Sequence, residues 1–381
     1  MFNGETGGGS IFRAQMVRTL SEKYTVETIS VATPNIDVLE GTRGPLITLS
    51  FNNIAALIKA VQQNDLIIQS GSYTPLTVLC AYVSLLSGSR CHTFITMNSV
   101  IATNTNYTGL EWMVAYLLYV SSDYLNSALS MSTWTRSSEY LSSLRQIGVP
   151  VRGIVYLDDQ YDIFRCPDTE EDIAKAREFL CSGITGKPIL LYVGRIVKEK
   201  RVELLIRNKP AEALLVIVGG GAHADSIAQY HCPEKGIICH LGNMLPQSEI
   251  RKYYKASDVM VSASNFETLG NTVMESLLCG TPVIVENAGG YRAQVVNGQN
   301  GYLVDWTKPA EVQKAYNAIM SQGVTDLSPI KSDQSRSVQD IVDISLRRPV
   351  GVFHVVHAIL FLPLVMLYLT LVWLWFLLGN P

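Results

Sequence analysis

Short apolar, β-branched runs alternate with amphipathic stretches along the first half of the chain. The stretches that predict helices are residues 9–23, 54–63, 75–87 and 107–126. The runs that predict strands are residues 26–31, 46–49, 66–69 and 92–96, with weaker candidates at 129–131 and 153–156. This alternation is typical of a parallel sheet covered by helices, so the pattern predicts an α/β unit.

A second series of the same kind begins near residue 186. Its predicted strands are residues 189–193, 214–218, 236–240, 259–262, 282–285 and 301–304. Its predicted helices are residues 248–255, 270–279 and 309–321, and the charged stretch 168–181 is expected near a hinge. Two consecutive Rossmann-like units predict a ligand cleft between the carboxyl ends of their sheets. We therefore expect domains at 1–185 and 186–327, followed by a polar linker at 328–349.

The end of the chain has a different pattern. Residues 358–378 carry no charge and consist largely of Leu, Val, Phe and Trp. A run of this length can cross a bilayer as a helix, although a buried helix of a soluble domain is the alternative. Arg347 and Arg348 precede the run, which favours a cytosolic or stromal location for the preceding domains. We therefore predict a single-pass C-terminal transmembrane anchor at 350–379, with a plastid membrane as one possible location.

The composition of the chain argues against two classes of binding partner, nucleic acids and zinc ions. The 381 residues have a net charge of -3, which argues against a broad nucleic-acid surface. The seven cysteines show no C-x-x-C spacing, so reduced thiols are expected rather than a zinc site. No metal ion or cofactor is expected.

Two carboxylates bracket a predicted loop-to-helix junction. Glu267 precedes the junction and Glu275 lies within the following helix, with Leu269 and Gly270 between them. The start of a helix offers free N–H groups to a diphosphate, and carboxylates accept hydrogen bonds from sugar hydroxyls. Because a nucleotide-sugar has both kinds of group, this segment predicts a nucleotide-sugar site.

A second candidate segment follows the strand at 189–193. Gly194 ends the strand, and the next loop presents Arg195 and Lys200 before a helix. Two cations at the carboxyl edge of a sheet can hold a diphosphate and offset the charge of a leaving nucleoside diphosphate. Lys198 and Arg201, in the same loop, are expected to be solvated.

Two glycine clusters provide further candidates. Gly8 and Gly9 precede the first helix, and Gly220 follows the strand at 214–218. Glycine lets the backbone approach a phosphate or sugar closely, although a plain turn is the alternative in each case. The first cluster begins so near Met1 that the strand expected before it is missing or reduced to Met1 and Phe2.

These motifs resemble family 4 (GT-B) glycosyltransferases. The resemblance rests on Gly194-Arg195 with Lys200, the Glu267 and Glu275 pair, and the turns at 280–283 and 288–290. Within that family, residues 193–205, 256–259 and 267–270 are similar to sulfoquinovosyltransferases of sulfolipid synthesis.

The resemblance implies retaining transfer, without a metal, from a UDP-sugar to a membrane lipid such as diacylglycerol. It implies that Arg195 and Lys200 hold the diphosphate and that Glu267 contacts the sugar. It further implies that backbone N–H groups near Leu269 and Gly270 lie close to the donor and that Glu275 binds the ribose. The same resemblance places Gly8 and Gly9 near the donor from the opposite domain.

Two other interpretations remain open. Many relatives carry a histidine after the strand at 92–96, whereas residues 94–99 here contain none, and His92 lies early in that strand. The chain therefore also fits a non-catalytic, membrane-anchored relative. A GlcNAc-phosphatidylinositol-type or other lipid-linked glycosyltransferase is the alternative within the same class.

Overall fold

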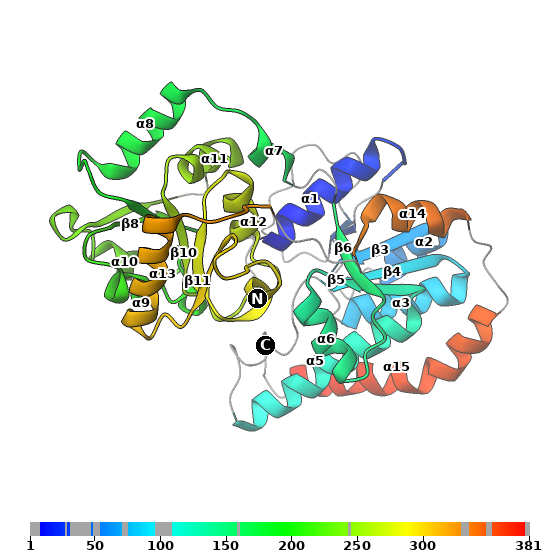
Figure 1. Ribbon diagram of the computed structural model, residues 1–381. Helices are drawn as coiled ribbons and strands as arrows, with labels where there is room; N and C mark the ends of the chain where they lie inside the picture. The colour runs from blue at the N-terminus through cyan, green and yellow to red at the C-terminus, as the bar shows by residue number, and fades with distance from the viewer. Residues whose placement is uncertain are drawn as a thin grey trace. The chain divides into compact units, whose positions relative to one another are not determined.

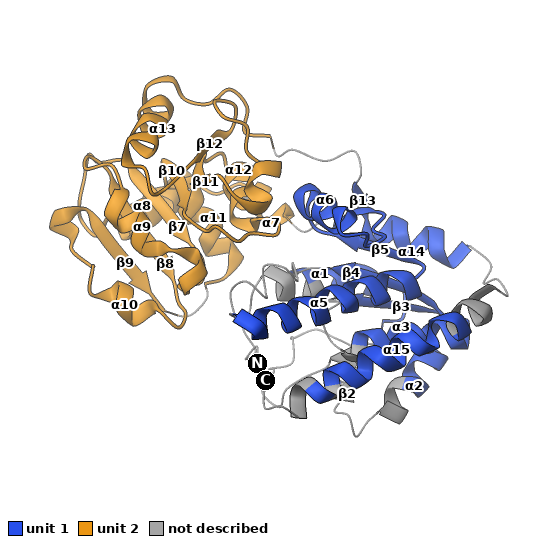
Figure 2. Ribbon diagram, turned by 90° about the horizontal axis from the view of Figure 1, so that it is seen from below, with its two compact units in different colours: residues 1–158, 332–381 blue, residues 159–331 orange. Residues whose placement is uncertain are grey.

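The computed structural model describes residues 8–26, 29–30, 47–48, 54–70, 75–95, 109–157, 161–242, 245–328, 335–347 and 353–377. The chain forms two compact units, shown in different colours in Figure 2. Unit 1 contains residues 1–158 and 332–381, and unit 2 contains residues 159–331.

Unit 1 is built on a five-stranded parallel sheet with the order β13-β6-β5-β4-β3. Its strands are β3 (Leu66–Ser70), β4 (Arg90–Ile95), β5 (Ser132–Thr135), β6 (Gly153–Tyr156) and β13 (Ser335–Ser337). A separate two-residue pair joins β1 (Ile29–Ser30) to β2 (Ile47–Thr48). The helices are α1 (Gly8–Ser21), α2 (Ile54–Gln63), α3 (Pro75–Ser87), α5 (Gly109–Leu129), α6 (Ser138–Gln146), α14 (Val338–Arg347) and α15 (Phe353–Leu377).

Helices cover both faces of the unit 1 sheet (Figure 1). Phe12 of α1 and Ile341 of α14 pack with Phe94 of β4 in one apolar cluster. On the other face, α3 and α5 form a cluster that includes Cys91 of β4. The β4 side chains alternate between the two clusters because neighbouring residues of a strand point to opposite faces.

The predicted transmembrane anchor is wrong. In the part of the chain that the structure describes, no helix is long and apolar enough to cross a membrane. Val365, Tyr368 and Val372 of α15 are instead buried in the cluster that α3 and α5 form, with exposures of 1%, 4% and 6%. The membrane location inferred from residues 350–379 is therefore withdrawn. An uncharged apolar run indicates burial, but it does not say whether lipid or protein covers the helix.

Unit 2 contains a six-stranded parallel sheet with the order β12-β11-β10-β7-β8-β9. Its strands are β7 (Ile189–Val193), β8 (Leu214–Gly219), β9 (Ile237–Leu241), β10 (Val259–Ser262), β11 (Val283–Glu286) and β12 (Gly301–Val304). The helices are α7 (Asp162–Arg165), α8 (Glu170–Cys181), α9 (Val202–Asn208), α10 (Ala224–Ala228), α11 (Gln247–Lys255), α12 (Asn271–Leu278) and α13 (Pro309–Gln322). Short 3₁₀ turns lie at η2 (Lys198–Lys200), η3 (Pro233–Lys235) and η4 (Gly289–Ala293).

The strands of unit 2 are apolar on both sides because both faces of the sheet are covered. In β8, Leu214 and Val216 pack in the cluster that contains residues of α8, α11 and α12. Leu215 and Ile217 pack in the opposite cluster, with residues of α9 and α13. Continuous apolar runs of this kind are typical of parallel strands that are buried on both faces. The predicted α/β architecture with two Rossmann-like units is thus observed.

Three boundaries differ from those expected from the sequence. Helix α8 packs into unit 2 through Ala176 and Leu180, so unit 2 begins at residue 159 rather than 186. The stretch expected to be a linker contains β13 and α14, which complete unit 1. Strand β5 begins at Ser132 rather than in the run 129–131, because α5 continues to Leu129.

Candidate functional site

The sheet of unit 2 has a topological switch point. Strands β7 and β10 are neighbours, and the chain leads outward from them in opposite directions, through β8 and β9 on one side and β11 and β12 on the other. The connections after β7 and β10 therefore separate at the carboxyl edge, where open α/β sheets bind ligands. The loops that follow these two strands carry Lys200 and Glu267 respectively.

An ion pair joins these two loops. The Nζ of Lys200 contacts Oε1 of Glu267, and the two side chains are only 17% and 16% exposed. Partial burial strengthens such a pair and fixes both groups in place. The structure thus brings together two residues that the sequence predicted to face the same ligand.

Arg195 lies in the same loop as Lys200 and is more exposed. Its Nη2 is 3.9 Å from Glu199 Oε1, and its side chain is 39% exposed. Its backbone carbonyl accepts a 2.7 Å hydrogen bond from the hydroxyl of buried Tyr192. The start of the loop is therefore held by its backbone, and the Arg195 side chain is partly exposed.

Arg201 does not lie in solvent as the sequence suggested. Its Nη2 is 2.9 Å from Glu286 Oε2, with the two side chains 24% and 13% exposed. Its Nε donates a 2.7 Å hydrogen bond to the carbonyl of Ala263. Because Ala263 and Glu286 lie at the ends of β10 and β11, Arg201 ties the Lys200 loop to both strands.

Gly194 and Gly220 lie where strand ends approach each other. The Gly194 N–H donates to the Val218 carbonyl at 3.1 Å, and the Ile196 N–H donates to the Gly220 carbonyl at 2.7 Å. A Cβ on Gly220 would lie 2.2 Å from the carbonyl oxygen of Gly242, so this position excludes any side chain. Close backbone packing therefore accounts for Gly220, and its predicted role toward a nucleotide stays a prediction.

The loop after β10 turns into α12 at Gly270. Gly270 has a φ of 78°, a left-handed conformation that favours glycine, and Leu269 before it is half-buried. The first N–H groups of α12 have no carbonyl partner within the helix, so they can donate to a bound anion. The predicted helix N-terminus is thus present beside Glu267.

Glu275 lies within α12. Its Oε2 accepts a 3.0 Å hydrogen bond from the Tyr254 hydroxyl, and burial raises its pKa to about 7. A carboxyl with such a pKa changes charge near neutral pH. Its oxygens can accept hydrogen bonds from the hydroxyl groups of a ligand. The role of Glu275 toward ribose stays a prediction.

The remaining predicted site residues lie in unit 1. Gly8 and Gly9 begin α1. The strand expected before them and the loop expected to carry the histidine, residues 96–99, lie outside the described residues. His92 is a buried residue of β4 between the hydroxyls of Ser132 and Ser345, at 2.7 Å and 2.5 Å.

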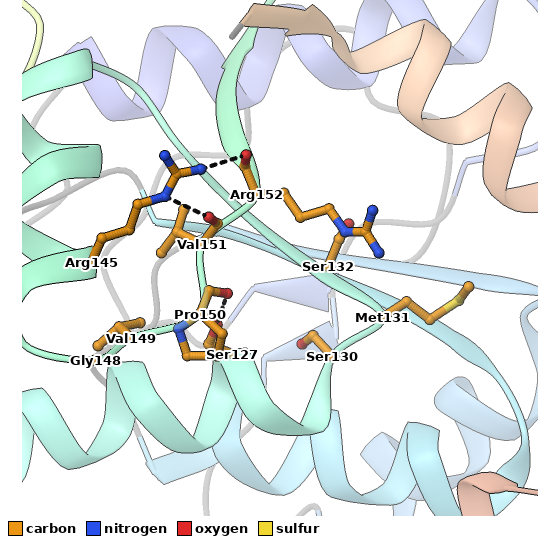
Figure 3. A pocket seen from close by; sticks show the side chains of 10 residues that line it. All are labelled: Ser127, Ser130, Met131, Ser132, Arg145, Gly148, Val149, Pro150, Val151 and Arg152. Carbon is orange, nitrogen blue, oxygen red and sulfur yellow. Dashed lines mark hydrogen bonds between the residues drawn. The ribbon is translucent and has the colours of Figure 1, made fainter.

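Two depressions lie among the described residues, in unit 2 and in unit 1 respectively. In unit 2, a depression of 360 Å³ lies at the carboxyl ends of β8 and β9, lined by residues that include Gly219, His240 and Tyr253. In unit 1, a depression of 530 Å³ lies before the amino ends of β5 and β6, with Arg145 and Arg152 on its wall (Figure 3). Ligands of parallel sheets bind at the carboxyl edge, so only the first adjoins the candidate site.

Comparison with known proteins agrees with this geometry. Residues 179–335 match the family Glycosyl transferases group 1. This match covers most of unit 2, including Arg195, Lys200, Glu267 and Glu275. The resemblance to GT-B glycosyltransferases predicted from the sequence is confirmed, because residues 179–335 are similar to the group 1 glycosyltransferases.

Relatives of known name include two glycosyltransferases. The chain is 34% identical over 150 residues to the D-inositol 3-phosphate glycosyltransferase of Thermomonospora curvata, a match that covers 35% of this chain and 34% of that protein. It is 31% identical over 136 residues to the sulfoquinovosyl transferase SQD2 of Arabidopsis thaliana, covering 35% and 26% respectively. The match thus spans about a third or less of either relative.

The fold is also similar to solved structures. HepE of Anabaena, crystallised with UDP-glucose, superposes with a TM-score of 0.64 at 16% identity, covering 86% of this chain and 90% of that one. The lipopolysaccharide outer core galactosyltransferase WaaB superposes with a TM-score of 0.56 at 17% identity, covering 94% and 96%. At these identities the similarity shows the GT-B fold alone.

Proposed function

We propose that this protein transfers a sugar from a UDP-sugar to a lipid acceptor with retention of configuration, as a sulfoquinovosyl-diacylglycerol-synthase-like enzyme. The observation that carries the proposal is the contact between Lys200 and Glu267 at the switch point of unit 2, beside the start of α12. A cation, a carboxylate and free N–H groups together match the diphosphate and the hydroxylated sugar of one donor.

The proposed donor complex assigns each group a task. Arg195, Lys200 and the N–H groups near Leu269 and Gly270 bind the diphosphate, which needs no metal ion for charge compensation there. The Glu267 carboxylate accepts a hydrogen bond from the sugar, and Glu275 accepts hydrogen bonds from the ribose. The depression lined by Gly219 and Tyr253 is of suitable size and position for the uracil base.

The proposed transfer occurs on one face of the sugar. The bond between the anomeric carbon and the β-phosphate oxygen breaks, and the acceptor hydroxyl oxygen forms the new bond on the same side. The departing phosphate takes the hydroxyl proton, and Arg195 and Lys200 stabilise the charge that develops on UDP. A covalent enzyme intermediate is not part of the proposal.

The acceptor distinguishes the two candidate functions. Similarity to the Arabidopsis sulfoquinovosyl transferase favours diacylglycerol, whereas similarity to the Thermomonospora enzyme favours an inositol phosphate. We favour the lipid because residues 267–270 resemble the sulfolipid enzymes.

The test uses the full chain with UDP-glucose, UDP-GlcNAc or UDP-sulfoquinovose, each with diacylglycerol in detergent or with inositol 3-phosphate. We expect a glycolipid from one donor, with the donor's anomeric configuration by NMR, unchanged by EDTA and lost in Glu267→Ala. A product only with inositol 3-phosphate would establish the second candidate. UDP binding without any transfer would identify a non-catalytic relative.

A further inference from the structure

The space beneath the candidate donor loop is filled by Tyr291. This residue lies in η4, after β11, and its side chain is fully buried. A Cβ on Gly270 would lie 2.6 Å and 2.7 Å from two Tyr291 ring carbons. The ring therefore packs directly against the residue at which α12 begins.

The hydroxyl of Tyr291 reaches the acidic residue of the site. It lies 3.2 Å from Glu267 Oε1 and 2.8 Å from Ser262 Oγ. The Tyr291 hydroxyl donates toward both oxygens, so its one proton is shared between the Glu267 carboxylate and the Ser262 hydroxyl. Burial raises the pKa of Tyr291 well above its ordinary value, which keeps this proton in place.

The backbone beside Tyr291 holds the same loop. The Gly290 N–H donates a 2.7 Å hydrogen bond to the Glu267 carbonyl. A Cβ on Gly289 or Gly290 would lie 2.5 Å from the Glu267 carbonyl oxygen or 2.4 Å from that of Thr268. The η4 turn therefore fixes both the backbone and the side chain of Glu267.

Lys200 and Tyr291 reach the same carboxylate oxygen, Oε1. These two contacts leave Oε2 for a hydroxyl of the sugar. When the Lys200 ammonium turns toward a bound diphosphate, its contact with Glu267 weakens, whereas Glu267 is the one acidic partner of the Tyr291 hydroxyl among the described residues.

We propose that Tyr291 is a positioning residue that holds the Glu267 carboxylate for the donor sugar through its hydroxyl. The inference rests on the proposed function, because it assigns Tyr291 a task toward the sugar rather than toward UDP. Sequence reasoning missed this residue, since a tyrosine after Gly290 has the appearance of an ordinary core residue.

The first experiment compares wild type, Tyr291→Phe and Tyr316→Phe. For each protein, the affinities for UDP and UDP-glucose are measured, and so are the initial rates of sugar release or transfer from pH 5 to 9. Tyr316 is a buried tyrosine of α13 outside the site, so its variant controls for loss of a buried hydroxyl. We expect Tyr291→Phe to keep UDP affinity within about twofold and to lose about tenfold in kcat, because a hydrogen bond to a charged group is lost.

The second experiment needs no turnover. A double-mutant cycle of Tyr291→Phe and Glu267→Ala on urea unfolding should show coupling at pH 7, because each single change removes the same contact. Additive changes, or a kcat of Tyr291→Phe equal to that of wild type, would overturn the inference. Absence of UDP binding in wild type would instead refute the proposed function, and with it the role of Tyr291 toward the sugar. In that case the double-mutant cycle would still show whether Tyr291 and Glu267 interact.

Discussion

Lys200 Nζ and Glu267 Oε1 are in direct contact although their residues belong to different loops of unit 2. The contact exists because β7 and β10 are neighbours in the sheet, so the loops that follow them begin side by side. In the proposed donor complex, the ammonium binds the diphosphate and the carboxylate binds the sugar.

Replacing Lys200 by alanine should therefore impair transfer strongly. We expect Lys200→Ala to lower kcat by about 10²–10³-fold, because a cation that stabilises the leaving diphosphate is lost. Steady-state kinetics with the donor found active will measure the change. Lys198→Ala, which alters an exposed lysine of the same loop, is the matched control. Equal losses in the two variants would contradict the assignment.

Glu275 should make the ligand-free protein less stable as pH rises. Its pKa is about 7 in the folded protein, compared with 4.5 for the ordinary group. A raised carboxyl pKa means that folding favours the protonated form, so its contribution is complete below pH 4.5 and is lost as pH rises through 7. We expect this loss to be about 1–3 kcal/mol of unfolding free energy.

Urea unfolding between pH 4.5 and 8 will measure this dependence. Glu275→Gln should flatten the curve, because the amide keeps a carbonyl acceptor for Tyr254 and cannot ionise. Glu178→Gln, on the exposed side of α8, should follow wild type. An unchanged slope in Glu275→Gln would show that another group is responsible.

Replacing Arg201 by glycine should lower the free energy of unfolding less than replacing it by alanine. Its φ of 49° is left-handed, a conformation that costs a non-glycine residue about 1–2 kcal/mol. Arg201→Ala keeps this cost and loses the contacts to Glu286 and Ala263, whereas Arg201→Gly loses the contacts but relieves the backbone. We expect urea unfolding to show Arg201→Gly more stable than Arg201→Ala by about 1 kcal/mol. The reverse order would mean that this conformation is not retained in solution.

Helix α15 should contribute to the stability of unit 1. Val365 is 1% exposed in the cluster with α3 and α5, so Val365→Ala should cost about 1–3 kcal/mol of unfolding free energy. Leu367 on the same helix is 57% exposed, and Leu367→Ala should change stability by less than about 0.5 kcal/mol. Thermal or urea unfolding of the two variants will compare them. Equal effects would indicate that α15 does not pack as described.

The regular elements of unit 2 could be predicted from local sequence. The runs at 189–193, 259–262 and 301–304 coincide with β7, β10 and β12, because strands buried on both faces are continuous apolar runs. Strand β13 and helix α14 could not be recognised in the same way, since β13 is a three-residue polar strand, Ser335–Ser337. Only pairing with β6 makes it part of the sheet.

The candidate site was partly visible in the sequence. Arg195, Lys200, Glu267 and Glu275 stood out because charge follows apolar strands at points where parallel sheets bind ligands. Tyr254 and Tyr291 did not stand out, because a buried aromatic ring in the sequence gives no indication of where its hydroxyl points. Arg201 was assigned to solvent for the same reason, since its acceptors belong to other strands.

The sequence by itself determined the two α/β units, the parallel strands of unit 2 and the charged residues that follow them, because these depend on local periodicity and residue chemistry. The tertiary structure decided which loops meet, which oxygen of Glu267 is held and what covers α15. Those properties depend on strand order and on contacts between residues far apart in the chain. The apolar run of α15 does not say which of its side chains are covered, and the structure shows that Val365, Tyr368 and Val372 pack against α3 and α5 whereas Leu367 is exposed.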